Sequence, residues 1–355
     1  MGFKRVKFVN FRNIEPQEIK ISGGLNLLTG FNGSGKTNIL EGLNILSGWS
    51  TLESGTKTRD LVQRGSENKE VLLTGQKDDE YGDIIQAKIG ERYSIRYNNE
   101  QISATELRFR MPVLCFLPND TQLVEGAAAR RRRLLNVILA LIVPAYAKRI
   151  SEYTRAVKQK AALLKRREKT EQIDKVIKPL AVWIWKMRKE AVLLLNEEIK
   201  KQDKLVPENT ELTFFRGGAN IKENEEDDFI AGIEEKREKE KQSGMPLVGP
   251  HRDDLVIKTN EELSANVLSR GFRRRTAVAL MLAAGDSVYR KTGNIPTLLL
   301  DEVTAELDAE GRAVLFGTLR DRKAQVFAAT AEPFTEHFFG TIYKVDKGKV
   351  EVFSE

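Results

Sequence analysis

The stretch Gly30-Phe31-Asn32-Gly33-Ser34-Gly35-Lys36-Thr37 fits the pattern G-x-x-x-x-G-K-[ST], which is typical of a phosphate-binding loop. The glycines allow backbone turns that a Cβ would block, so that successive N–H groups can point at one anion. We expect Lys36 to reach the β- and γ-phosphates and the Thr37 hydroxyl to bind Mg²⁺. The stretch therefore predicts that the chain binds a nucleoside triphosphate.

The segments on either side of this loop have the patterns of a buried strand and of a helix. Residues 25–29 form a short apolar run, and residues 39–46 place their apolar side chains with a helical period. A helix that starts at the loop directs the positive end of its dipole at bound phosphates. Strand, glycine loop and helix thus follow in the order that a triphosphate site requires.

An apolar run that ends in two carboxylates supplies the other half of the predicted site. Residues 296–300 suit a buried strand, and Asp301 and Glu302 follow directly, as in the Walker B pattern. The strand end would deliver Asp301 to Mg²⁺ and leave Glu302 to orient and deprotonate the attacking water. We therefore name Lys36, Asp301 and Glu302 as catalytic candidates, and Thr37 and Asp301 as metal ligands.

The long separation between Lys36 and Asp301 predicts an inserted domain, because compact nucleotide kinases and small GTPases need far fewer residues there. Strand patterns dominate residues 1–124, helical and basic sequence fills residues 125–245, and strand patterns resume over residues 246–355. We expect an α/β fold in which residues 1–124 and 246–355 form an ATPase head with a mixed sheet and helices. Residues 125–245 would form an inserted, mostly α-helical lobe.

Two apolar stripes predict an antiparallel helix pair within this lobe. The first stripe runs from Tyr146 to Leu164 with steps of three and four residues. The second begins at Leu180, and we expect its helix to start just after Pro179, since proline favours the first turn of a helix.

Composition narrows the class of protein. The 355 residues, 41% apolar and 31% charged, describe a globular chain, and its net charge of +7 suits a polyanionic partner without requiring one. A single cysteine, Cys115, and 2 histidines argue against disulfides and a structural zinc site. The N-terminus lacks the apolar core of a secretion signal, and the longest apolar run, residues 134–147, is too short to span a bilayer. We expect a cytoplasmic location and no membrane contact.

A third motif lies between the lobe and Asp301. Leu268-Ser269-Arg270-Gly271-Phe272 resembles the L-S-x-G-Q signature of the ATP-binding-cassette (ABC) superfamily, with Phe272 in place of glutamine. In that superfamily the signature serine and glycine lie at a helix N-terminus, whose free N–H groups face the γ-phosphate bound by a second subunit. The resemblance implies an ABC-type head whose ATP sites are complete only in a head-to-head dimer.

Within this superfamily the chain resembles the bacterial RecF family over nearly its whole length. The most distinctive match is Gly249-Pro250-His251-Arg252-Asp253-Asp254-Leu255, hereafter the GPHRDDL segment. Further matches are the F-R-N opening at residues 11–13, the N-G-x-G-K-T-N-[LI]-L-E loop at 32–41, the F-x-P-E-D-x-x-L-V-x-G segment at 116–126 and the L-L-D-[DE]-V-x-x-E-L-D segment at 299–308.

The chain departs from the family pattern at a few positions. Asn136 stands where the family usually has aspartate, and Lys160-Ala161 replaces a common R-N. Cassette transporters carry a switch histidine after the strand that follows Walker B, whereas this chain has Ala328-Ala329-Thr330 there, similar to the threonine-rich run of RecF proteins. The residue that senses the γ-phosphate is therefore left open.

The resemblance implies both ligands and partners. RecF proteins bind ATP with Mg²⁺ and DNA, form a homodimer on ATP, and help load the recombinase RecA at gaps coated by single-strand-binding protein (SSB), together with RecR and RecO. We therefore expect a slow, switch-like ATPase that acts in DNA replication, recombinational repair and the SOS response. The expected nucleotide contacts are Arg12, Asn13, Gly30, Asn32, Gly33, Ser34, Gly35, Lys36, Thr37, Asn38, Ser269 and Gly271.

Two other readings of the motifs stay open. A RecF-like accessory or defence-system ATPase would share them and work with a nuclease partner. The ATPase subunit of a membrane transporter would share the loop, signature and Walker B, but it would normally show the switch histidine and a glutamine loop.

The expected DNA contact is sequence-independent, with double-stranded or gapped DNA. The densest basic cluster, Arg130-Arg131-Arg132-Arg133, is the candidate for binding its phosphates. For His251 we favour a packing or hydrogen-bonding role over catalysis.

Overall fold

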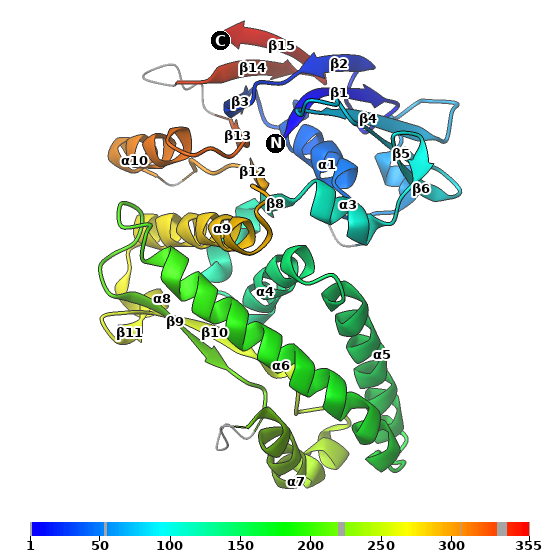
Figure 1. Ribbon diagram of the computed structural model, residues 1–355, viewed down its shortest axis with the longest axis vertical. Coiled ribbons are helices and arrows are strands. Elements are labelled where there is room, and N and C mark those ends of the chain that lie inside the picture. Colours follow the sequence, from blue (N-terminus) through cyan, green and yellow to red (C-terminus); the bar gives the residue numbers. More distant parts are fainter. Residues whose placement is uncertain (1, 53–54, 219–223, 306, 332–338, 355) are drawn as a thin grey trace. The chain divides into compact units, whose positions relative to one another are not determined.

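The structure is a computed structural model that describes residues 2–52, 55–218, 224–305, 307–331 and 339–354 (Figure 1). The chain divides into two units. The first comprises residues 1–121, 270–281 and 288–355, and the second comprises residues 122–269 and 282–287. Helix α9 (Arg270–Thr292) belongs to both units, because residues 282–287 group with the second.

A mostly parallel sheet of the first unit is built from apolar runs. Its strand order is β15-β14-β3-β13-β12-β8, with β15 antiparallel to β14 and the other neighbours parallel. Every residue of β12 and β13 is buried, as expected for strands covered on both faces. The strands are β3 (Leu25–Thr29), β8 (Val113–Phe116), β12 (Thr297–Leu300), β13 (Val326–Thr330), β14 (Thr341–Asp346) and β15 (Lys349–Ser354).

The strand register brings the two halves of the predicted site to one edge of this sheet. Thr29 pairs with Thr330, and Leu300 pairs with Ala328. The strands β3, β13 and β12 are parallel and in this register, so the loop that follows β3 and the carboxylates that follow β12 emerge at the same edge. Ligands of open α/β sheets bind at this carboxyl edge.

An antiparallel sheet completes the strands of the first unit, in the order β2-β1-β4-β5-β6-β7. Buried and exposed residues alternate along β4, β5 and β6, which is the pattern of a sheet with one covered face. The strands are β1 (Phe3–Val9), β2 (Gln17–Lys20), β4 (Val71–Lys77), β5 (Ile84–Ile89), β6 (Tyr93–Tyr97) and β7 (Glu100–Gln101).

Helix α1 (Lys36–Leu46) packs against strands of both sheets, namely β4 and β5 of the antiparallel sheet and β13 of the mostly parallel sheet. Its Ile39, Leu40 and Leu43 are buried in a core that also contains Phe8 and Phe327. The helix behind the glycine loop is therefore held from two sides. The first unit also contains α2 (Thr58–Leu61), α3 (Ala104–Arg110), α10 (Ala309–Arg320) and most of the 3-10 helix η1 (Pro118–Leu123).

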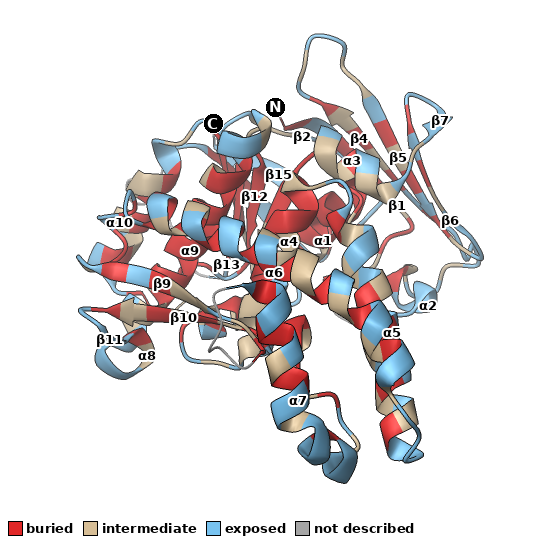
Figure 2. Cartoon of the chain, turned by 60° about the horizontal axis from the view of Figure 1, so that its bottom comes forward, coloured by how far each residue is buried: buried red, intermediate tan, exposed pale blue. Residues whose placement is uncertain are grey.

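The second unit is mostly helical. Helix α6 packs against α4, α5, α7 and β9, and a three-stranded antiparallel sheet has the order β11-β10-β9. Figure 2 shows buried and exposed residues alternating along α5 and α6 with a helical period. The elements are α4 (Ala128–Ile142), α5 (Tyr146–Lys165), α6 (Glu171–Ile199), β9 (Thr210–Phe215), α7 (Glu225–Ser243), η2 (Pro250–Arg252), β10 (Asp254–Thr259), β11 (Glu262–Leu263) and α8 (Ser264–Val267).

The predicted start of the second long helix is wrong. Helix α6 begins at Glu171, and Pro179 lies inside it. A proline costs an interior helix one backbone hydrogen bond and some strain. Ile173 and Ile177, which precede the proline, are buried and extend the apolar stripe. Their burial offsets that cost, so tertiary packing overrides the local helix-start signal.

The division of the chain into 1–124, 125–245 and 246–355 remains a prediction. In the structure, residues 246–269 group with the second unit, because β10 pairs along its length with β9. Each helix within the described ranges is either too short or too polar to cross a membrane.

Candidate nucleotide-binding site

The glycine loop joins β3 to α1 in a shape that requires glycine. Gly30 has φ 154°, and a Cβ added there would lie 2.1 Å from the backbone oxygen of Val345. Gly35 has φ 119° and is the N-cap of α1, where none of the described side chains caps the helix. The first N–H groups of α1 thus lack a side-chain cap, which makes this helix end suitable for a phosphate.

The Lys36 side chain lies along the inside of the loop. Its Nζ donates hydrogen bonds to the backbone oxygens of Gly30 (2.7 Å) and Phe31 (3.0 Å). Burial lowers the pKa of Lys36, while the negative charges of Asp301 and Glu302 act in the opposite direction. A cation held by neutral carbonyls inside a glycine loop is well placed to exchange those contacts for phosphate oxygens.

Thr37 and Asp301 meet at the carboxyl edge of the sheet, although they are 264 positions apart in the chain. The Thr37 hydroxyl donates to Asp301 Oδ2 at 2.8 Å. Asp301 Oδ1 is buried and has no hydrogen-bond partner within the described ranges, and the same holds for the Ser34 hydroxyl in the loop. Burial raises the pKa of Asp301, and the hydrogen bond from Thr37 opposes this shift.

These donors fit a magnesium ion that arrives with a nucleotide. Mg²⁺ commonly takes one or two protein oxygens, with phosphate oxygens and waters as its remaining ligands. A threonine hydroxyl beside a carboxylate with a free, buried oxygen matches that requirement. Among the described residues, no group of three or more His, Cys, Asp or Glu side chains could hold a metal by itself.

Glu302 follows Asp301 in an unusual backbone conformation, with φ 47°. Its side chain is exposed, whereas Asp301 is buried. The carboxylate is therefore free to meet a water in front of the γ-phosphate. Glu306, which belongs to the predicted segment after Walker B, lies outside the described residues.

Arg12, Asn13 and Asn38 lie around the loop in different roles. Arg12 forms a two-pronged ion pair with Glu41 of α1, at 2.8 and 3.1 Å. Asn13 donates to the backbone oxygen of Gly33 at 3.0 Å and accepts a hydrogen bond from Asn38 at 2.7 Å. The Asn13 contacts hold the glycine loop in position. The Arg12 guanidinium faces Glu41.

Sequence reasoning missed a further support of the loop, the turn between β14 and β15. The N–H of Gly348 donates to the backbone oxygen of Ser34 at 2.8 Å. Gly348 has φ 88°, and a Cβ there would lie 1.8 Å from the backbone oxygen of Asn13. The only signal in the sequence was a glycine in a short turn near the C-terminus, which does not reveal its neighbour.

Ser269 and Gly271 lie at the start of α9, which begins at Arg270. This is the predicted arrangement of the signature at a helix N-terminus. Arg274 lies one helical turn further along, is buried, and donates to the backbone oxygens of Glu302 and Val303.

Together these features define a P-loop ATPase of the ABC type. The strand–loop–helix unit, the Thr37–Asp301 pair and the signature at the start of a helix are its elements. The chain belongs to the RecF/RecN/SMC N terminal domain family, whose profile matches residues 3–351.

Curated relatives agree with this family. The chain is 27% identical to the DNA replication and repair protein RecF of Listeria monocytogenes serotype 4b (strain CLIP80459), covering 99% of this chain and 100% of the relative. It is 29% identical to the protein of the same name from Heliobacterium modesticaldum (strain ATCC 51547 / Ice1), covering 100% of both chains. The resemblance to RecF that the motifs indicated is thus confirmed.

Solved structures agree with the fold. One is described as the recombination mediator protein RecF-ATPrS in the RecFOR pathway; it has a TM-score of 0.87 at 23% identity and covers 99% of this chain and 98% of that one. An Smc head bound to the C-winged helix domain of ScpA has a TM-score of 0.60 at 16% identity and covers 100% of this chain and 98% of that one. The predicted α/β, ABC-type head is confirmed.

The basic cluster of residues 130–133 is partly used inside the second unit. Arg131 forms a two-pronged ion pair with Asp254, at 2.7 and 3.0 Å. Arg132 donates to the backbone oxygen of Asp253 at 2.8 Å. Arg133 is exposed and Arg130 is partly exposed. DNA contact by this cluster therefore remains a prediction that falls mainly on Arg130 and Arg133.

Asp253 of the GPHRDDL segment is a buried junction of the second unit. Its Oδ1 accepts from Trp185 Nε1 and from the N–H of Gly217, both at 2.7 Å, and its Oδ2 accepts from Arg188 at 2.6 Å. Burial raises the pKa of Asp253 to about 6, so the carboxylate is ionised at pH 7. Arg188 also donates to Asn136 at 2.8 Å, so asparagine can accept this bond where the family usually has aspartate.

His251 has a hydrogen-bonding role, as expected. Its Nε2 lies 3.0 Å from the backbone oxygen of Pro246, which can only accept, so Nε2 carries the proton. Nδ1 then accepts from the Tyr153 hydroxyl at 2.6 Å. Burial lowers the pKa of His251 to about 4, so the ring is neutral at pH 7.

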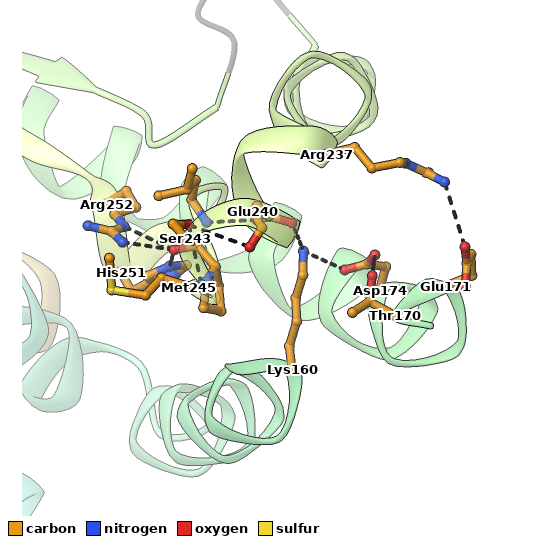
Figure 3. A network of polar contacts seen from close by, with 12 residues as sticks. Lys160, Thr170, Glu171, Asp174, Arg237, Glu240, Ser243, Met245, His251 and Arg252 are labelled. Carbon is orange, nitrogen blue, oxygen red and sulfur yellow. Dashed lines mark hydrogen bonds and ion pairs between the residues drawn. The ribbon is translucent and has the colours of Figure 1, made fainter. Parts of the chain in front are cut away.

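A second buried charge network joins three helices of the same unit (Figure 3). Lys160 of α5 forms ion pairs with Asp174 of α6 at 2.8 Å and with Glu240 of α7 at 2.6 Å. Glu240 also accepts from the N–H of Leu247 at 2.7 Å. Lys160, a departure from the family pattern, therefore joins the three helices through its two ion pairs.

Proposed function

We propose that the chain is an ATP-dependent, DNA-binding recombination mediator that dimerises on ATP and helps load the RecA recombinase at gapped, SSB-coated DNA. The observation that carries the ATPase part is the Thr37–Asp301 pair with its free, buried carboxylate oxygen beside the glycine loop. The DNA-repair part rests on the curated relatives, which are named DNA replication and repair protein RecF.

The residues divide the work of hydrolysis as follows. The N-terminus of α1 and Lys36 bind the β- and γ-phosphates, and Thr37 and Asp301 hold Mg²⁺. Bound Mg²⁺ neutralises charge on the phosphates. Glu302 orients the attacking water and takes its proton. Asn13 and Asn38 keep the loop in shape through Gly33.

We propose that hydrolysis is slow and serves as a switch. Ser269 and Gly271, at the start of α9, would contact the γ-phosphate held by a second copy of the chain. ATP would then join two copies, and hydrolysis would separate them. The same proposal includes work with RecR and RecO and roles in DNA replication, recombinational repair and the SOS response, as the resemblance to the RecF family implies.

A trapped dimer tests this proposal. Glu302→Gln keeps the size and hydrogen bonds of the side chain but cannot accept the proton, so ATP binding survives and hydrolysis falls to a slow residual rate. We expect light scattering with ATP and Mg²⁺ to show a persistent dimer. Adding Ser269→Arg should break the dimer while calorimetry still detects ATP binding, whereas adding Ser151→Arg, at an exposed serine of α5, should not. A Glu302→Gln protein that stays monomeric at saturating ATP would refute head-to-head engagement.

DNA binding has its own test. Contact with the phosphate backbone predicts an affinity for gapped duplex that is independent of sequence, falls steeply with salt and rises with ATP. A titration without a salt slope and without an effect of ATP would remove DNA from the proposal.

A further inference from the structure

Arg274 links the first turn of α9 to the backbone of the proposed catalytic glutamate. Its side chain is 5% exposed, its Nε donates to the backbone oxygen of Val303 at 3.3 Å, and its Nη2 donates to the backbone oxygen of Glu302. A buried guanidinium placed against two successive carbonyl groups fixes the plane of the turn that contains them.

Glu302 needs such support more than its neighbour Asp301 does. Asp301 is fixed by its N–H, which donates to Phe116 at 2.9 Å, and by the Thr37 hydroxyl at 2.8 Å. Glu302 follows the end of β12, outside the paired strand, and its φ of 47° lies in the left-handed region. A residue other than glycine keeps that conformation only where its surroundings hold it.

We propose that Arg274 is a positioning residue for ATP hydrolysis, which holds the Glu302 backbone so that the carboxylate faces the attacking water. The inference rests on the proposed function, because it assigns Glu302 the role of general base. Arg274 itself would touch neither ATP nor water.

Arg274 also lies close to the signature along α9. The helix begins at Arg270, directly after Ser269, so the signature and Arg274 share its first turns. From Thr276 to Gly285 the helix is buried without interruption, which makes it a stiff element. Movement of its N-terminus on contact with a second copy would therefore shift the Glu302 backbone in the same chain. A misplacement of about 1 Å is enough to slow an enzyme on the order of a hundredfold.

Three variants of the full chain test this role. Arg274→Met removes both donors, Arg274→Lys keeps a cation that can reach one carbonyl, and Lys291→Met removes an exposed charge from the last turn of the same helix. We expect Arg274→Met to lower kcat about tenfold or more with ATP affinity in calorimetry changed less than about threefold. Arg274→Lys should recover part of the rate, and Lys291→Met should match the parent.

Comparing Arg274→Met in the parent and in the Glu302→Gln variant distinguishes a loss of Glu302 positioning from a general loss of stability. If Arg274 acts through the Glu302 carboxylate, adding Arg274→Met to Glu302→Gln should change the residual single-turnover rate less than about twofold. An equal loss in both backgrounds, or an unchanged kcat in Arg274→Met, overturns the proposal. Should Arg274→Met fail to fold, Arg274→Lys carries the same comparison, and it must show a lower kcat that vanishes in the Glu302→Gln background.

The outcomes also distinguish this inference from the proposed function. A parent protein that binds ATP but never hydrolyses it refutes the ATPase and, with it, a role for Arg274. A parent that hydrolyses ATP and depends on Glu302 but not on Arg274 refutes this inference alone.

Discussion

Replacing Asp253 by alanine should destabilise the second unit severely while leaving its surface unchanged. The side chain is 0% exposed and accepts hydrogen bonds from Trp185, Gly217 and Arg188 at 2.6 to 2.7 Å. Its removal leaves a buried arginine without its carboxylate and two buried N–H groups without an acceptor. Asp253→Ala therefore tests whether the distinctive GPHRDDL segment is structural.

The expected loss follows from the contacts. Removing one partner of a buried ion pair costs about 3–5 kcal/mol, because the other charge stays buried. Arg188 keeps two acceptors, the backbone oxygen of Pro250 at 2.6 Å and Asn136 at 2.8 Å, which limits the penalty. The two orphaned N–H groups add about 1–3 kcal/mol each where they find no water. We expect a loss of at least about 4 kcal/mol in the free energy of unfolding: about 3 kcal/mol for the arginine, which keeps two acceptors, and about 1 kcal/mol for one N–H group that finds no water.

Urea unfolding followed by tryptophan fluorescence measures this loss. Trp183 and Trp185 lie in α6 of the second unit, whereas Trp49 lies in the first unit, so most of the signal reports on the affected part. Asp203→Ala is the matched control, because Asp203 is exposed, and it should change stability by less than about 0.5 kcal/mol. If the free energy of unfolding of Asp253→Ala lies within about 1 kcal/mol of the parent value, the structural role argued for Asp253 is refuted. Normal stability combined with lost activity would instead indicate a functional role for the segment.

Three further outcomes are expected. Lys36→Ala should abolish tight ATP binding in calorimetry, because it removes the ammonium inside the glycine loop, and unchanged affinity would contradict the site. Gly348→Ala should weaken ATP binding at least about tenfold, since its Cβ would lie 1.8 Å from the Asn13 oxygen and displace the turn that holds Ser34. Gly293→Ala is the control for strain alone, because no atom of the described residues lies within 4 Å of its Cβ. The folded-state pKa of His251 is about 4, below its ordinary value near 6.5. Between these pH values the folded chain binds fewer protons than the unfolded chain, so the free energy of unfolding falls as the pH drops from 6.5 to 4. The stability difference between the parent and His251→Gln should therefore shrink by up to about 3 kcal/mol over that window, and a constant difference would show that His251 does not titrate in this way.

Part of the candidate site was readable from short stretches of sequence. The loop of residues 30–37 encodes its own geometry, because glycine spacing sets the backbone turns and the following apolar period sets the helix. The apolar run before Asp301 likewise specifies a buried strand with a carboxylate at its end. Local rules of this kind also predicted strand-rich segments and a helical lobe, whereas the ABC-type fold class came from the resemblance to a known family.

The same local rules failed where packing decided the outcome. Pro179 carried the signal of a helix start, yet buried Ile173 and Ile177 continue α6 through it. Arg131 belonged to an exposed-looking basic run, yet it pairs with Asp254, 123 positions away. A proline inside a helix costs about 3 kcal/mol, and burying one isoleucine side chain contributes about 1.5–3 kcal/mol, so two buried isoleucines are enough to continue α6.

The phosphate loop, the strand that ends in carboxylates and the signature at a helix start could each be predicted from a stretch of about ten residues. Which distant groups meet could not be predicted in this way. The sheet order β3-β13-β12 places Thr37 beside Asp301, the turn at Gly348 reaches the loop, and Arg274 reaches the Glu302 carbonyl. These contacts depend on strand register and on helix packing, which are set by the summed burial of the whole core and leave no pattern in any short stretch.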